Sequence, residues 1–163
     1  MTAMPMRNEP VRLANLLSTW FGCGYAPVAP GTAGSAAAIL LAVALHAWAG
    51  LRGWHFAILA AILFYPAVWA AGITARAKRA KDPSCVVVDE VVGQWLTLAG
   101  AHTLNWKSLL AAFALFRLFD IWKPAPVRQL EALPGGLGIN ADDAMAGGYA
   151  ALVLFLAGWW GLY

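Results

Sequence analysis

The chain has 163 residues, enough for one compact unit and too few for two comfortable domains. Hydrophobic residues make up 61% of it and charged residues only 12%, about half the charged fraction usual in soluble domains, so the composition indicates a membrane protein. The net charge is +3, but 11 basic residues are too few and too scattered for a nucleic-acid surface, and we expect no nucleic-acid partner. They fit the cytoplasmic loops of a membrane protein better.

The two cysteines, Cys23 and Cys85, lack CxxC spacing and neighbouring histidine ligands. We therefore expect neither a disulfide framework nor a zinc site, and interpret both as ordinary small side chains in a reducing compartment. The N-terminal stretch 1–20 also lacks the compact apolar core and the cleavage site of a signal peptide.

The first predicted element is a short amphipathic helix over residues 8–21. One face of it carries Leu13, Leu16, Leu17 and Trp20, so we expect this helix to lie at the membrane interface. A loop rich in Gly and Pro follows. Residues 33–51 are then almost wholly apolar and would be about 28 Å long as a helix, close to the thickness of a bilayer core.

Four further apolar runs follow. Residues 54–73 carry no charge, and a basic loop comes after them. Residues 91–104 would be only about 21 Å long as a helix, which leaves open a crossing with little tilt, a locally thinned bilayer or a half-span. Residues 106–122 form the next run, ended by a proline-rich segment, and 144–163 form the last. The sequence thus predicts an all-α, polytopic bundle of about five membrane helices plus an interfacial helix, as one domain over 1–163.

The basic residues predict an orientation. If the N-terminus is cytoplasmic and all five runs cross the membrane, only Arg52 and Lys107 of the 11 basic residues lie outside. Such an asymmetry follows the positive-inside rule. The residues placed on the cytoplasmic side are Arg7, Arg12, Arg76, Lys78, Arg79, Lys81, Arg117, Lys123 and Arg128.

Five of the eight acidic residues lie at predicted helix ends. Asp89 and Glu90 open one helix, Asp120 closes the next, and Asp142 and Asp143 open the last. All three ends are cytoplasmic in this topology, so they can converge on one patch. Helix capping explains most of these acids singly. It does not explain Asp120, because a helix C-terminus disfavours an anion, and ionisable residues at membrane depth are candidates for function.

Clustered carboxylates repel one another unless a cation lies among them, and all-oxygen ligands favour a hard ion such as Mg²⁺. We therefore expect these five acids to act in catalysis by holding one or two Mg²⁺ ions, directly or through waters. The three histidines lie toward the opposite side, and we interpret them as interfacial or packing residues.

Small residues open the first membrane helix at its cytoplasmic end: Gly31, Thr32, Gly34 and Ser35. Free backbone amides and hydroxyl groups there predict a phosphate cradle. The alternative is that these residues only allow close helix packing within the membrane.

The part of the chain from about residue 21 onward contains four characteristic stretches: "PVAPGTAGS" (27–35), "VVVDEVVGQWLTL" (86–98), "FRLFDIWKPAPVR" (116–128) and "GGLGINADDAMAG" (135–147). Together they resemble the phosphatidylglycerophosphatase A family of bacterial inner-membrane lipid phosphatases. The resemblance implies an all-helical fold, a role in phospholipid synthesis and Mg²⁺-dependent removal of the terminal phosphate from phosphatidylglycerophosphate. The residues themselves indicate a cation, a phosphate and a membrane surface, but not the glycerol head group.

In the resulting hypothesis Arg117 and Lys123 bind phosphate oxygens, Arg in a planar fork and Lys as a point charge. The cradle completes this contact, and Arg128 holds the lipid's second phosphate, the diester. The substrate is a phospholipid in the cytoplasmic leaflet whose acyl chains enter laterally. No obligate protein partner is expected.

Three alternatives stay open at this point. A carboxylate, with Asp89 as the candidate, can act as nucleophile in place of water. The enzyme can prefer another lipid phosphate. A small transporter could line its pathway with the same acids, although no carboxylate lies in the middle of a confident span. A nucleotide-dependent lipid synthase is disfavoured, because the chain lacks a D-x-x-D-G pattern.

Overall fold

The computed structural model describes residues 9–163, which contain helices and no strand, so the predicted all-α class is confirmed. Arg7 and residue 8 of the predicted interfacial helix lie outside the described residues. The helices are α1 (Glu9–Ser18), η1 (Cys23–Tyr25), α2 (Pro30–Ala49), α3 (Gly53–Lys78), α4 (Val88–Leu98), α5 (Trp106–Trp122), α6 (Val127–Leu130) and α7 (Gly136–Trp159).

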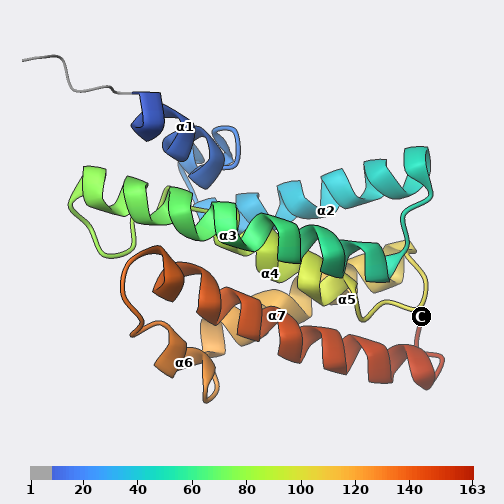
Figure 1. Ribbon diagram of the computed structural model, residues 1–163. Coiled ribbons are helices and arrows are strands. Elements are labelled where there is room, and N and C mark those ends of the chain that lie inside the picture. Colours follow the sequence, from blue (N-terminus) through green and yellow to red (C-terminus); the bar gives the residue numbers. More distant parts are fainter. Residues whose placement is uncertain (1–8) are drawn as a thin grey trace, which may run out of the picture.

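Helix α4 is the centre of the bundle. It packs against α2, α3, α5 and α7, and all of its residues except Leu96 are buried. The four longer helices run alongside it in alternating directions, so that α2, α4 and α7 begin near the end at which α3 and α5 finish (Figure 1). The chain order therefore brings the acidic helix ends to one end of the bundle.

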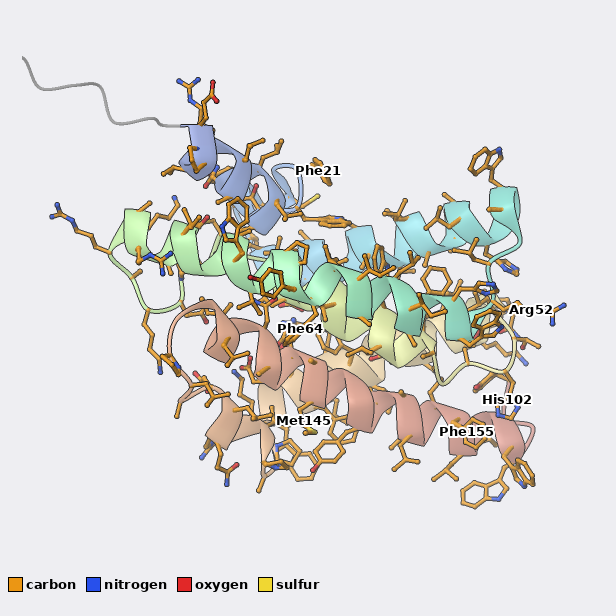
Figure 2. The ribbon with its side chains drawn as sticks, viewed as in Figure 1. Phe21, Arg52, Phe64, His102, Met145 and Phe155 are labelled. Atoms are coloured by element: carbon orange, nitrogen blue, oxygen red, sulfur yellow. The ribbon has the colours of Figure 1, made fainter. Side chains whose placement is uncertain are left out.

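Helices α2, α3 and α7 are long and apolar enough to cross a membrane. Their large apolar side chains project away from the bundle (Figure 2), and Leu40, Ile62 and Leu152 are all more than half exposed. A soluble monomer rarely exposes so much continuous apolar surface. The protein is therefore a membrane protein.

The structure corrects two predicted segments. The run 91–104 is a helix only as α4, from Val88 to Leu98, and 11 residues span about 16 Å, well short of a hydrocarbon core. The run 144–163 belongs to α7, which begins earlier, at Gly136. Asp142 and Asp143 thus lie inside the second turn of α7 and do not open it. By contrast, α5 has the bounds predicted for 106–122.

The predicted N-terminal helix is present as α1 and is tied to the bundle by small residues. Ala14 and Ser18 are buried, and the Ser18 hydroxyl hydrogen-bonds Thr74 Oγ1 of α3 at 2.8 Å. Of the predicted apolar face, Leu13 and Leu16 stay exposed, whereas Leu17 packs against the core and Trp20 is buried just beyond the end of α1. This leaves an apolar face free to enter the membrane interface.

Two glycines set the distance between α4 and α7. A Cβ on Gly147 would collide with the backbone oxygen of Gly93, and a Cβ on Gly93 would come within 2.7 Å of the backbone oxygen of Asp143. The Thr97 hydroxyl of α4 lies at the same contact, 2.9 Å from the Gly93 oxygen of its own helix and 3.4 Å from the Gly147 oxygen of α7. The two backbones therefore touch, which brings the first turn of α4 beside Asp143.

Candidate active site

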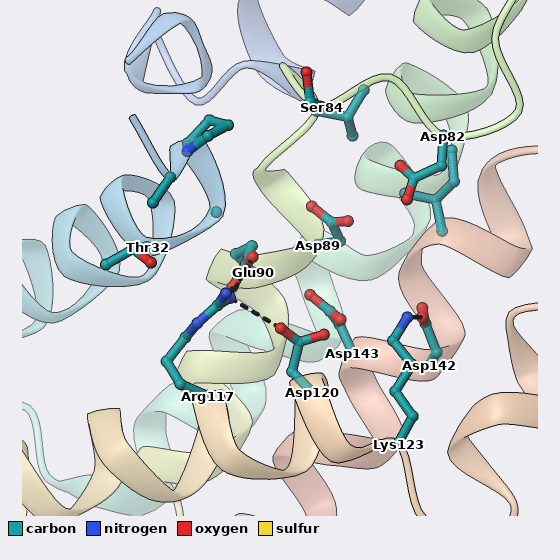
Figure 3. Close-up of a pocket in the computed structure, with 15 residues that line it drawn as sticks. Thr32, Asp82, Ser84, Asp89, Glu90, Arg117, Asp120, Lys123, Asp142 and Asp143 are labelled. Atoms are coloured by element: carbon teal, nitrogen blue, oxygen red, sulfur yellow. Dashed lines mark hydrogen bonds and ion pairs between the residues drawn. The ribbon is translucent and has the colours of Figure 1, made fainter. Parts of the chain in front are cut away.

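A cavity of about 310 Å³ lies where the acidic helix ends meet (Figure 3). The predicted convergence of the three acidic groups is therefore confirmed as geometry, while their roles in catalysis stay predictions. The acidic side chains that line the cavity are Asp82, Asp89, Glu90, Asp120, Asp142 and Asp143. Arg117, Lys123, Gly31 and Thr32 also line it.

Glu90 is fixed by contacts from two neighbouring helices. Arg117 Nη1 of α5 donates to both of its carboxylate oxygens, and the Ser35 hydroxyl of α2 donates to Oε2 at 2.6 Å. Arg117 also pairs with Asp120 at 2.9 Å, three residues along the same helix. A Cβ on Gly31 would overlap the Glu90 carboxylate, so a larger residue there would displace that side chain. Three helix ends are thus joined through one guanidinium and one carboxylate.

Lys123 joins the end of α5 to α7. Its Nζ donates to Asp142 Oδ2 at 2.8 Å and lies 3.4 Å from Glu131 Oε2. Burial lowers the pKa of Lys123, but the hydrogen bond and the charge of Asp142 outweigh it, so the pKa is raised above its ordinary value. The ammonium group is therefore a permanent positive charge on the cavity wall.

Asp89 and Asp143 have no such partner. Both are buried, with 9% and 4% of their surfaces exposed, and neither forms an ion pair within residues 9–163. Asp89 Oδ1 and Asp142 Oδ1 are buried without a hydrogen-bond partner among the described residues. Buried polar atoms are normally satisfied, so these oxygens indicate a missing cation or donor.

The donor set fits Mg²⁺ in the way that this ion usually binds. No three side chains of the types His, Cys, Asp and Glu in residues 9–163 stand close enough to enclose a metal ion by themselves. Mg²⁺ commonly takes one or two carboxylates and completes its shell with waters and substrate phosphate. Asp89 and Asp143 face the cavity together and supply such a pair (Figure 3).

The predicted phosphate cradle is only partly at the cavity. Thr32, together with Gly31, lines it, whereas Gly34 packs against Val87 and the Ser35 hydroxyl is used by Glu90. For Gly34 and Ser35 the structure therefore favours a packing and positioning role. Their depth inside α2 explains the difference, because only the first turn of a helix has free amides.

Arg128 lies outside this cavity and lines a neighbouring one of about 370 Å³. The two cavities share Lys123. The sequence-predicted cationic residues are thus distributed over two adjacent cavities at the same end of the bundle.

Sequence reasoning missed Asp82 and Ser84, which lie in the loop between α3 and α4 and line the cavity. The loop is pinned where the Val87 amide donates to the Ser18 oxygen at 2.8 Å. Partial burial raises the pKa of Asp82; Lys123 opposes this shift, and the charges of Glu131 and Asp120 add to it. The available signal was a lone acid within an otherwise basic segment, followed by proline.

An apolar helical bundle with this charged cavity at one end is the architecture of a membrane-embedded enzyme. The chain belongs to the phosphatidylglycerophosphatase A family, whose model matches residues 16–158. It is accordingly a lipid phosphatase.

Three relatives cover most of the chain. A protein of Bacteroides thetaiotaomicron, named "Putative phosphatidylinositol-3-phosphatase", is 40% identical to this chain. The match covers 93% of this chain and 97% of the length of that protein. A phosphatidylglycerophosphatase A of Haemophilus influenzae is 40% identical over 90% and 89% of the two chains. That of Escherichia coli is 34% identical over 88% and 83%. No solved structure matches the chain significantly.

Proposed function

We propose that this protein removes the terminal phosphate of phosphatidylglycerophosphate in a Mg²⁺-dependent reaction of phospholipid biosynthesis, giving phosphatidylglycerol and inorganic phosphate. The observation that carries the proposal is a pair of buried carboxylates, Asp89 and Asp143, that have no ion-pair partner in residues 9–163 and face a cavity also lined by Arg117 and Lys123. The names of the relatives in H. influenzae and E. coli support the glycerol head group.

A second candidate is a phosphatase for another lipid phosphate. It is favoured by the relative in B. thetaiotaomicron, whose name specifies a phosphatidylinositol phosphate. The two candidate substrates share their chemistry, since each carries a phosphomonoester in addition to the phosphodiester of the lipid.

The residues of the cavity divide into two functions. Asp89 and Asp143 would hold Mg²⁺, which would offset the negative charge of the phosphate and lower the pKa of a bound water. Arg117 is ion-paired with Glu90 and Asp120 and holds both carboxylates in place, and its remaining N–H donors would contact the substrate phosphate. Lys123 supplies a second positive charge against the phosphate oxygens, and the Thr32 hydroxyl contacts them from α2.

The test is phosphate release by the purified protein in detergent, with Mg²⁺ and after chelation. We expect phosphatidylglycerophosphate to be hydrolysed faster than phosphatidylinositol phosphate and phosphatidic acid, and chelation to abolish all three reactions. Faster hydrolysis of phosphatidic acid would refute the head-group assignment. An absence of phosphate release from every lipid would favour the transporter instead.

The proposed location is a bacterial inner membrane, with the cavity facing the cytoplasm. The asymmetry of the basic residues supports it, because Arg52 lies at the opposite end of the bundle, beside His102 and Phe155 (Figure 2). We expect Lys78→Cys to react with an impermeant thiol reagent only after the cells are opened, and Arg52→Cys to react from outside. Labelling of both residues from the same side would contradict this topology.

A further inference from the structure

The second cavity, beside the active-site cavity, has its own chemical character. Its lining residues are Trp122, Lys123, Pro124, Ala125, Arg128 and Gln129. Lys123 lines both cavities, so the two lie next to each other.

Contacts with α5 and α7 fix the segment that forms this cavity. The backbone turns sharply at Lys123, in the left-handed region with φ of 49°, directly after α5 ends. The Tyr149 hydroxyl of α7 donates to the Ala125 oxygen at 3.0 Å, and Val127 is fully buried against the α5–α7 contact. Arg128, the next residue, is therefore presented outward from a fixed position.

Charge and exposure show which ligand this cavity fits. Among the described residues, Arg128 forms no ion pair, whereas Lys123 is already paired with Asp142 and Glu131. Arg128 and the amide of Gln129 are exposed beside Trp122, which is 62% exposed and adjoins the apolar surface of α5. An unpaired guanidinium beside an exposed tryptophan suits an anionic group at the level where lipid head groups meet acyl chains.

We propose that this second cavity binds the phosphodiester of the substrate through Arg128, while the terminal phosphate lies in the active-site cavity. The inference rests on the proposed function and deepens it. A lipid with a phosphodiester and a phosphomonoester fills both cavities, whereas phosphatidic acid, which has only the monoester, fills one. Arg128 is therefore a residue that sets specificity for lipids with two phosphates.

The first test compares kcat/KM for phosphatidylglycerophosphate and phosphatidic acid in the intact protein and in Arg128→Gln. We expect the preference for phosphatidylglycerophosphate to fall roughly tenfold in Arg128→Gln, the lower range for a charge-assisted contact at an exposed site. Arg128→Lys should keep part of it. The matched control is Arg76→Gln, an exposed arginine near the same end of the bundle, and it should keep all of it. The proposal would be overturned if Arg128→Gln lowered kcat/KM equally for both lipids or left the preference unchanged. It would also be overturned if Arg76→Gln lowered the preference as much as Arg128→Gln.

A second measurement does not depend on turnover. Short-chain phosphatidylglycerol, which keeps the diester and lacks the terminal phosphate, should stabilise the intact protein against thermal unfolding, and Arg128→Gln should lose this shift. Stabilisation by inorganic phosphate should be equal in the two proteins. If the intact protein binds phosphatidylglycerol through Arg128 but hydrolyses no lipid phosphate, the proposed function fails and the diester site stands. If it hydrolyses phosphatidylglycerophosphate but the phosphatidylglycerol shift survives in Arg128→Gln, the diester site fails alone.

Discussion

Asp89→Asn and Asp143→Asn should each lower kcat by at least about 100-fold, the scale expected when electrostatic stabilisation of a transition state is removed. Both variants should still insert and fold, because neither carboxylate has an ion-pair partner among the described residues that the change would strand. Without metal they should be at least as stable as the unmodified protein, since each removes a buried charge from a crowded group of like charges. Phosphate release and thermal unfolding measure these two effects separately.

The metal gives this prediction its sharpest control. Mg²⁺ should raise the unfolding temperature of the unmodified protein and leave both variants nearly unchanged, because a ligand stabilises only the state that binds it. Asp82→Asn, at the exposed rim, should lose only about tenfold in rate, equivalent to about 1.4 kcal/mol. Glu131→Gln should be nearly silent. Equal losses in all four variants would indicate general fragility and not a site.

Asp120→Asn should be inactive, and the double variant Arg117→Gln with Asp120→Asn should stay inactive while inserting normally. The competing explanation is a simple ion pair within α5, in which Asp120 only neutralises its neighbour at 2.9 Å. In that case removing both partners is tolerated, as it often is for half-buried pairs. If Asp120 instead binds the metal ion, directly or through water, and Arg117 binds the phosphate, the double variant cannot regain turnover.

The structure makes the double variant more informative, because Arg117 also holds Glu90 of α4. Removing Arg117 leaves the Glu90 carboxylate with only the Ser35 hydroxyl as a side-chain partner. We therefore expect the double variant to unfold at a lower temperature than Asp120→Asn alone. Recovery of activity in the double variant, measured as phosphate release, would show that the charges serve the helix and not the chemistry.

The sequence predicted the helical class and the meeting of the acidic helix ends, because apolar runs and their interruptions are local properties. It misplaced the start of α7 because "GGLGIN" reads as a turn, and glycine is a poor helix former. In the folded chain, Gly136 lies against the backbone of α3, where a Cβ would not fit. Packing there outweighs local propensity.

The pairing of charges was beyond sequence reasoning. The pairing of Arg117 with Asp120 follows from their spacing of three residues along one helix. The pairings of Arg117 with Glu90 and of Lys123 with Asp142 join different helices, which spacing in the sequence does not predict. Their positions depend on the register between α4 and α7, which the contact of Gly93 with Gly147 sets. Asp82 was missed for the same reason, since only the folded loop brings it to the cavity.

The position of the cavity at the helix ends has a consequence for membrane asymmetry. Within residues 9–163 the interior beneath it is filled by α4, whose Val91, Val92 and Leu98 are fully buried, and a head group would have to displace these side chains to reach the other face. On the proposed function, substrate enters and product leaves through one monolayer. Any product found in the opposite monolayer must then be carried there by a separate flipping step.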